Sequence, residues 1–478
     1  MPWRYLVILL LAAIPRAIAQ GLPDLGEPAQ GDLSPLQERR LGESIMREAR
    51  LDRAFYDDTE VSDYLNKLGL RLAAHSTDAR QYFEFFLLRD NQINAFALPG
   101  GFIGVHTGLI LNAQSESEAA SVLAHEIAHV TQRHIARMFA QQKQSALVSL
   151  ATMALAILAA RSSSQAGEAA VALGQAGVIQ AQLNFTRDAE READRVGLQI
   201  LERAGFDPRA MVTFFERLQR STRVYEGGAP SYLRTHPLTF ERIADVQNRI
   251  ESLPYRQVAD GLEFQMMRAK LRAELDAPRD AVAFFREGLA ERRYLSESST
   301  RYGLTLALLR MEDYAAAKRE LQVLRKALPA NASVETVACR VQLVSGEVKG
   351  ALSCYEDALR TFPHYRALAL DYADALLARG QADVALKFIE GRLQAQGEDY
   401  KLYLLQARAY AMLGKRLAQH RAQGEAYARM GNITGAVEQM QLAVKSGDAD
   451  FFMRSSAEAR LRELRKLNDE LRRDGVKR

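Results

Sequence analysis

Two histidines and a glutamate are spaced in this chain as in a metal site carried by one helix. In the segment His125-Glu126-Ile127-Ala128-His129 the two histidines lie four residues apart, so on a helix both imidazoles share one face and can bind one metal ion. Glu126 then lies beside the metal, where it can act as a general base. Catalytic zinc takes three protein ligands and keeps one position for water. The motif therefore predicts a third ligand elsewhere, although a pattern of five residues also arises by chance in long chains.

An acidic cluster further along the chain offers that third ligand. Glu190, Glu192 and Asp194 lie on one predicted helix, and two histidines with one glutamate form a known catalytic zinc set. The alternative is a solvated helix face, which is the usual role of such a run. The spacing alone does not choose among the three acids.

Three further positions bear on the choice of metal-site histidines. A metzincin needs glycine and histidine three and six residues after His129, but these positions hold Gln132 and Ile135, which excludes that class. His134 is expected to be a polar residue that continues the active-site helix. His236, which precedes a proline, is from the residues alone either a metal-site residue or a capping or core histidine.

The elements that must position these residues begin after an export signal. A basic start, an apolar run at 6–14 and small residues at 17–19 predict a signal peptide at 1–19, cleaved before Gln20, and hence export. An uncleaved anchor is the alternative, but the run is shorter than the ~20 residues that span a membrane. A lead-in rich in Gly, Pro, Asp and Ser covers 20–33 and is predicted to be flexible.

The region 34–258 combines helices with a small sheet. Ser34 and Pro35 predict the start of a helix to about residue 50, a second helix covers 61–75, and strands are expected at 82–88 and 102–105. The connecting segment NAFALPGG at 94–101 is either an ordinary hairpin connection or an edge that accepts an extended peptide. Most of 116–255 has helical period. The apolar stretch 146–160 is expected to be a buried helix or a lid over the site; the alternative is a peripheral contact with a membrane.

Residues 259–478 show a pattern that repeats about every 34 residues. A small residue recurs at Ala281, Ala316, Ala351 and Ala385, with spacings of 35, 35 and 34, and again at Ala436 after a gap of 51. The pattern resembles the tetratricopeptide repeat, in which paired helices stack into a solenoid. The long gap predicts an irregular helical insert around 415–424. An irregular bundle with chance alanines is the alternative.

Composition and charge exclude several classes. The chain has 478 residues, of which 48% are hydrophobic and 26% charged, as in a folded globular protein. Its net charge of +4, from 63 basic and 59 acidic residues, gives no signature of nucleic-acid binding. Its two cysteines, Cys339 and Cys354, lie in one predicted hairpin; after export they can form a disulfide, or they can remain buried thiols.

Three separated motifs resemble one family, the M48 zinc metallopeptidases. They are NAFALPGG at 94–101, HEIAH at 125–129 and EREAD at 190–194, in that order. The resemblance implies that Glu190 is the third zinc ligand and that Asp194 orients a ligand from outside the metal sphere. It also implies that His236 occupies the fourth zinc position and keeps the enzyme latent. Arg242 is implied, like Asp194, to act from outside the metal sphere. His106 is assigned no role.

We therefore predict a mainly α chain: an α+β zincin-like metallopeptidase domain with a small sheet (34–258), followed by an all-α tetratricopeptide-repeat solenoid (259–478). The site is His125, His129 and Glu190 around one Zn²⁺ per chain, with Glu126 taking a proton from water that attacks a peptide carbonyl. Family members with such repeats imply a periplasmic endopeptidase with chaperone-like activity. Its partners would be unfolded or partly folded outer-membrane β-barrel precursors, degraded when they stall, and the barrel-assembly machinery. The alternative is a repeat scaffold whose peptidase site is latent or inactive.

Overall fold

A computed structural model describes residues 33–78, 80–141, 187–222, 231–255, 258–448 and 451–476. The expected signal peptide, all but the last residue of the expected lead-in, and the apolar stretch 146–160 lie outside the described residues. That last residue, Leu33, is buried in a cluster of apolar side chains. None of the helices in the described ranges has the length and apolar character needed to cross a membrane.

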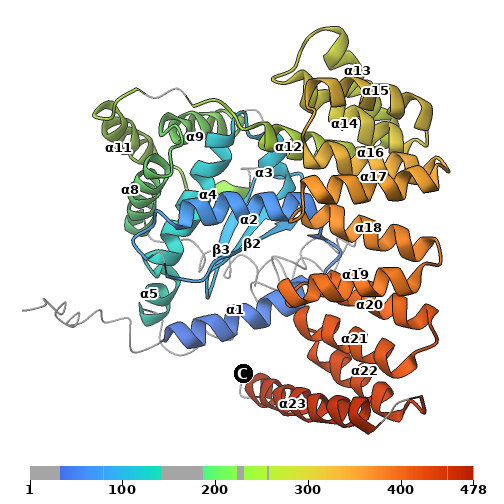
Figure 1. Cartoon of the computed structure of the whole chain (residues 1–478). Helices are drawn as coiled ribbons and strands as arrows, with labels where there is room; N and C mark the ends of the chain where they lie inside the picture. Colours follow the sequence, from blue (N-terminus) through green and yellow to red (C-terminus); the bar gives the residue numbers. More distant parts are fainter. Residues whose placement is uncertain are drawn as a thin grey trace, which may run out of the picture.

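Among the described residues, the N-terminal part holds a sheet of four strands. Helices surround this sheet (Figure 1). The strands are β1 (Phe55–Tyr56), β2 (Glu84–Leu88), β3 (Ala95–Leu98) and β4 (Phe102–His106). The helices are α1 (Pro35–Ala49), α2 (Thr59–Ala73), α3 (Thr107–Asn112), α4 (Glu116–Thr131), α5 (His134–Gln141), α8 (Arg187–Arg203), α9 (Arg209–Thr222), α10 (Ser231–Thr235) and α11 (Phe240–Glu251). As expected, α1 begins with Ser34 as its cap and Pro35 in its first turn.

The strands form one mixed sheet in the order β1-β2-β4-β3. β2 and β4 are parallel, whereas β3 and β4 are antiparallel, with Phe96 opposite Gly104. The segment at 94–101 is therefore a strand and a turn. A hairpin connection between the strands expected at 82–88 and 102–105 is wrong, because these two strands are parallel and the hairpin joins β3 to β4. An edge that accepts an extended peptide stays a prediction. Gly100 and Gly101 make the turn of the hairpin with φ of 78° and 86°, and a Cβ on Gly101 would lie 1.8 Å from the Tyr82 carbonyl oxygen. These positions therefore require glycine.

Both faces of the sheet are covered. Side chains alternate along a strand, and in β2 Phe85 and Leu87 pack against α2 and α4 while Phe86 and Leu88 pack against α1. This burial on both faces explains why the strands are continuous apolar runs rather than alternating ones. The helix that carries the predicted metal ligands, α4, lies on the same face as α2.

The C-terminal part is an array of helices stacked along one side of the sheet and its helices (Figure 1). Within the described residues they are α12 (Leu262–Leu275), α13 (Pro278–Ala290), α14 (Glu297–Arg310), α15 (Tyr314–Ala327), α16 (Ala332–Val344), α17 (Val348–Thr361), α18 (Arg366–Ala378), α19 (Ala382–Ala395), α20 (Tyr400–Met412), α21 (Arg416–Arg429), α22 (Ile433–Lys445) and α23 (Phe451–Val476). The recurring alanines are all buried between helices.

The prediction of an irregular helical insert around 415–424 is wrong. This segment belongs to α21, a regular helix that packs between α20 and α22. Glycines with positive φ end the turns before α17, α19, α21 and α22, at Gly346, Gly380, Gly414 and Gly431. Their spacings are 34, 34 and 17 residues, and 17 is half a repeat. The gap of 51 between alanines is therefore one and a half repeats, which the alanine pattern alone did not reveal.

The two cysteines form a disulfide. Cys339 in α16 is bonded to Cys354 in α17, with 5.4 Å between their Cα atoms. The bridge ties together the two helices of one hairpin, which resolves the choice that the sequence left open.

The start of α2 docks against the repeat array through charged side chains. Glu60 is buried, accepts a hydrogen bond from the Tyr365 hydroxyl at 2.6 Å and pairs with the Lys270 ammonium. Arg366 lies 3.0 Å from Asp63, and Lys401 lies 2.9 Å from Asp57. The contacting residues of the array come from α12, α18 and α20. This part of the array therefore packs against the N-terminal part of the chain and is not a free surface.

We expect Lys270→Met to destabilise the protein strongly. Burial by itself would lower the pKa of Lys270, but Glu60 and Asp58 raise it, so the ammonium is charged beside a buried carboxylate. Without the cation, Glu60 keeps a buried charge and loses the opposite charge that it contacts directly, which costs about 3–5 kcal/mol. Urea unfolding of the two proteins measures the loss.

The matched control is Lys67→Met. Lys67 also pairs across the same junction, with Glu263 of α12, but its side chain is 70% exposed. Its removal should cost less than about 1 kcal/mol. Equal losses for the two variants would contradict a role for burial.

Candidate metal centre

Helix α4 holds the first two candidate ligands in the interior of the N-terminal part. Ser115 caps the helix by accepting a hydrogen bond from the Glu118 amide, and every residue from 117 to 130 is buried. The sheet, α2, α8 and α9 all contact this helix. His125 and His129 therefore point from one face of a helix that has no freedom to reorient.

Helix α8 approaches α4 closely enough to bring in the third ligand. Gly197 lies against α4, where a Cβ would be 3.1 Å from the His125 Cα. Any larger side chain there would push the two helices apart. Glu190, two turns before Gly197 on the same helix, reaches both histidines: its carboxylate oxygens lie 3.5 Å from His125 Nε2 and 3.4 Å from His129 Nε2.

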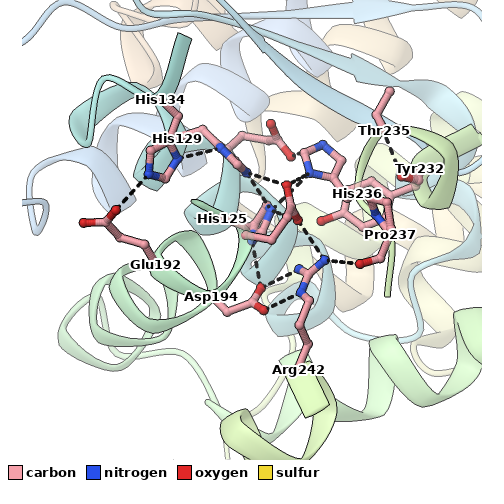
Figure 2. Close-up of polar contacts among 12 residues, drawn as sticks. His125, His129, His134, Glu192, Asp194, Tyr232, Thr235, His236, Pro237 and Arg242 are labelled. Atoms are coloured by element: carbon pink, nitrogen blue, oxygen red, sulfur yellow. Dashed lines mark hydrogen bonds and ion pairs between the residues drawn. The ribbon is translucent and has the colours of Figure 1, made fainter. Parts of the chain in front are cut away.

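His236 reaches the same position from the residue that follows α10. Its Nδ1 lies 3.0 Å from a Glu190 oxygen and 3.3 Å from His125 Nε2 (Figure 2). One ligand atom from each of His125, His129, Glu190 and His236 lies within 4.8 Å of the others, and all four residues are buried. Three elements far apart in sequence thus converge on one point.

The spacing of these atoms fits a tetrahedral metal. With bonds of about 2.0–2.1 Å to the metal, the ligand atoms of a tetrahedral site lie about 3.3 Å apart. The observed separations are 3.0 Å between His125 Nε2 and His129 Nε2, and 3.3 Å between His125 Nε2 and His236 Nδ1. Two uncharged imidazole nitrogens have no reason to approach this closely unless a proton or a cation lies between them. The donor set, three imidazoles and one carboxylate, suits zinc.

Asp194 and Arg242 contact two of these ligands, His125 and Glu190, outside the cluster of ligand atoms. The Asp194 carboxylate lies 3.0 Å from His125 Nδ1, and Arg242 donates two hydrogen bonds to it, at 2.7 and 2.8 Å. The same guanidinium lies 2.7 Å from Glu190 and donates to the Pro237 carbonyl at 2.8 Å. Arg242 therefore connects the third ligand, the partner of the first, and the loop that carries His236.

The charges of the ligands suit a cation. Burial by itself would raise the pKa of Glu190, but His236 and the hydrogen bonds from His125 and His129 hold it well below its ordinary value. Burial lowers the pKa of His129. Burial alone would also lower that of His125, yet Asp194 and Glu190 raise it to about 10. His125 must therefore release a proton when a metal binds, so metal affinity falls as the pH falls.

Glu126 lies beside the cluster without belonging to it. Its carboxylate is fully buried, has no hydrogen-bond partner among the described residues, and lies 3.4 Å from His236 Nε2. Burial raises its pKa, which strengthens it as a base. It is thus placed between the ligands and the edge of the sheet.

Two residues around the centre were not identified from the sequence, Gly197 and Tyr232. Gly197 sets the distance between the ligand helices, and no local pattern marks it. Tyr232 is buried and stacks on His236 with 4.7 Å between ring centroids; its hydroxyl has no hydrogen-bond partner among the described residues. Glu192 faces away from the cluster and contacts His134. His106 pairs with Asp90 at the end of β4, away from the centre.

Comparison with known proteins places the site within a matching segment. The family model described as Peptidase family M48 matches residues 60–250, and a tetratricopeptide-repeat model matches residues 343–409. All residues of the candidate centre lie inside the first match.

The chain is also similar to proteins over nearly its whole length. It is 34% identical over 454 residues to the beta-barrel assembly-enhancing protease of Escherichia coli, which covers 94% of this chain and 92% of that protein. A putative beta-barrel assembly-enhancing protease of Vibrio cholerae is 34% identical, covering 91% and 92%. The mitochondrial metalloendopeptidase OMA1 of Schizosaccharomyces pombe is 32% identical over 230 residues, covering 48% of this chain and 64% of that protein.

Proposed function

This chain belongs to peptidase family M48, and from this premise we propose that it is a periplasmic zinc metalloendopeptidase acting on outer-membrane β-barrel proteins during their assembly. The proposal includes a cleaved signal peptide at 1–19, a peptidase domain at 34–258 and a repeat domain at 259–478. Its ligands are His125, His129 and Glu190, with one Zn²⁺ per chain.

The observation that supports the chemistry best is the convergence of four buried side chains at tetrahedral spacing beside Glu126. When bound, zinc activates water and polarises a carbonyl. Glu126 takes the proton of the attacking water and delivers it to the leaving amine. Asp194 and Arg242 keep His125 and Glu190 in place.

The edge of the sheet offers the place for an extended substrate. Among the described strands β3 pairs with β4 alone. The Asn94 carbonyl accepts from His106 of β4, so the peptide groups of Ala95 and Ala97 point away from β4. The Ala97 backbone lies on the side of Glu126, whose pKa is raised by burial and lowered in part by this backbone. An extended peptide that paired with this edge by strand addition would run past Glu126, the proposed general base.

His236 is the proposed latch. It lies where the fourth ligand of a catalytic site would be water, so the arrangement described here is the closed one. The Arg242 hydrogen bond to the Pro237 carbonyl holds the loop. Opening requires His236 to leave the ligand cluster.

Replacing His236 by alanine is therefore expected to raise cleavage of unfolded substrates such as casein or an unfolded porin. If nine molecules in ten are closed, the gain is about tenfold. Initial rates at equal zinc content measure it.

The control is His75→Ala, which replaces an exposed histidine at the end of α2 and should leave the rate unchanged. A fall in the rate of His236→Ala at full zinc content would contradict the latch and make His236 part of the working site.

The clients are proposed to be β-barrel precursors, as the names of the relatives indicate. A cavity of about 730 Å³ between α1 and α21–α23 is a surface on which an unfolded segment could be held. Chaperone-like binding there and contact with the barrel-assembly machinery complete the proposal.

The test is cleavage of one porin, either unfolded or folded in detergent. Equal cleavage of both forms would contradict selection of stalled precursors.

A further inference from the structure

We propose that His134 and Glu192 form a relay that fixes the orientation and the tautomer of His129, and so are positioning residues for metal binding. The inference rests on the proposed metal centre. The relay runs from His129 through His134 to the carboxylate of Glu192 (Figure 2), whose side chain is partly exposed. Neither residue belongs to the four side chains that converge on the metal position.

The backbone turns sharply to make this contact. In a continuous helix a residue five positions on points about 140° away from the first, since each residue adds about 100°. α4 instead ends at Thr131, Arg133 adopts a φ of 51°, and α5 begins at His134. A positive φ is unfavourable for a residue with a side chain. Arg133 is held there by its hydrogen bonds to the Leu33 carbonyl and to Glu38, both at 2.7 Å.

The turn brings the two rings into direct contact. His129 Nδ1 lies 2.8 Å from His134 Nδ1, and His134 Nε2 lies 3.2 Å from a Glu192 oxygen. Arg137 lies 2.8 Å from the same oxygen of Glu192. His134 is buried, while the side chain of Glu192 is 25% exposed. The chain of contacts thus leads from the metal centre outward.

The proton positions follow from the chemistry of the ring. His129 Nε2 faces the ligand cluster, so it must present a lone pair to a metal, and the proton of the neutral ring then lies on Nδ1. That N–H donates to His134 Nδ1, which must be the acceptor. His134 therefore carries its proton on Nε2 and donates it to Glu192, an acceptor only. Each hydrogen bond of the relay therefore has a defined donor and a defined acceptor.

Metal-bound histidines usually donate their second nitrogen to a carboxylate, which raises ligand basicity. His125 does this directly, through Asp194. His129 does it through one intervening imidazole. The two ligands on α4 are therefore supported by different residues.

The test compares zinc affinity, measured by competition with a chelator, among variants of this relay. His134→Leu removes the acceptor, and we expect zinc binding to weaken about 10- to 100-fold. His134→Asn keeps an acceptor close to the position of Nδ1 and should recover most of the affinity. Glu192→Gln, at a partly exposed position that tolerates change, should weaken binding less than His134→Leu.

His106→Leu is the matched control. It removes another buried histidine that faces a carboxylate, Asp90 at 3.1 Å, but lies outside the metal centre. It should lower the melting temperature of the zinc-free protein and leave zinc affinity unchanged. Co²⁺ absorption spectra add a second readout, which should change for His134→Leu and not for His106→Leu.

Unchanged zinc affinity in His134→Leu would overturn the relay, as would an equal loss in His134→Asn and His134→Leu. If the wild-type protein itself binds no zinc, the proposed metal centre fails rather than the relay. The wild-type measurement therefore separates the two outcomes.

Discussion

Glu126→Gln should remove peptide cleavage while the protein keeps its metal. The glutamine has the same shape but takes no proton, and loss of a general base costs about 10²–10⁴ in rate. Since Glu126 is not among the four converging side chains, metal binding should not change. The measurement is kcat on an unfolded substrate, together with zinc content by elemental analysis.

The control for this variant is the wild-type protein purified in the same way and treated with a chelator. Both samples should be inactive, but only the wild type should recover when zinc is returned. Cleavage by Glu126→Gln at a wild-type rate would exclude Glu126 as the base.

Replacing Glu190 by alanine should weaken zinc binding by at least about 100-fold. Loss of a residue that only hydrogen-bonds to a metal ligand already weakens binding by up to about 100-fold. The glutamate contacts both histidines of α4, and without it the centre lacks its negative charge. Zinc stabilises the wild type by about 4 kcal/mol when present at 1,000 times Kd. The rise in melting temperature on adding zinc should therefore be lost in the variant.

Asp188→Ala is the matched control on the same helix. The side chain of Asp188 is 94% exposed and lies half a turn before Glu190. Its removal should leave both zinc affinity and the zinc-dependent rise in melting temperature as in the wild type. If Glu190→Ala bound zinc as tightly as Asp188→Ala, the third ligand would have to be another residue.

The array of repeats has a more definite role in the fold than the sequence suggested. The repeat pattern predicted only stacked helix pairs, whereas the structure places the start of α2 against α12, α18 and α20 through charged side chains, among them the buried pair of Glu60 and Lys270. The largest apolar cluster includes side chains from both parts of the chain, among them Leu65 of α2 and Leu271 of α12. The peptidase part and the array are thus packed as one body.

Local periodicity was sufficient for much of this protein. His125, Glu126 and His129 share a helix, so their relative positions follow from 3.6 residues per turn. The same holds for Glu190 and Asp194. The recurring alanines predicted stacked helix pairs, because each pair must repeat its close contact at the same interval.

Only the tertiary structure decided how these helices meet. Which of three acids faces the histidines depends on the rotation of α8 against α4, and that contact depends on Gly197. The approach of His236, the half repeat at α21 and the return of His134 to His129 depend on turns whose direction no helical period encodes. Periodicity specifies the face of one helix, whereas a metal centre is built from the distances between several.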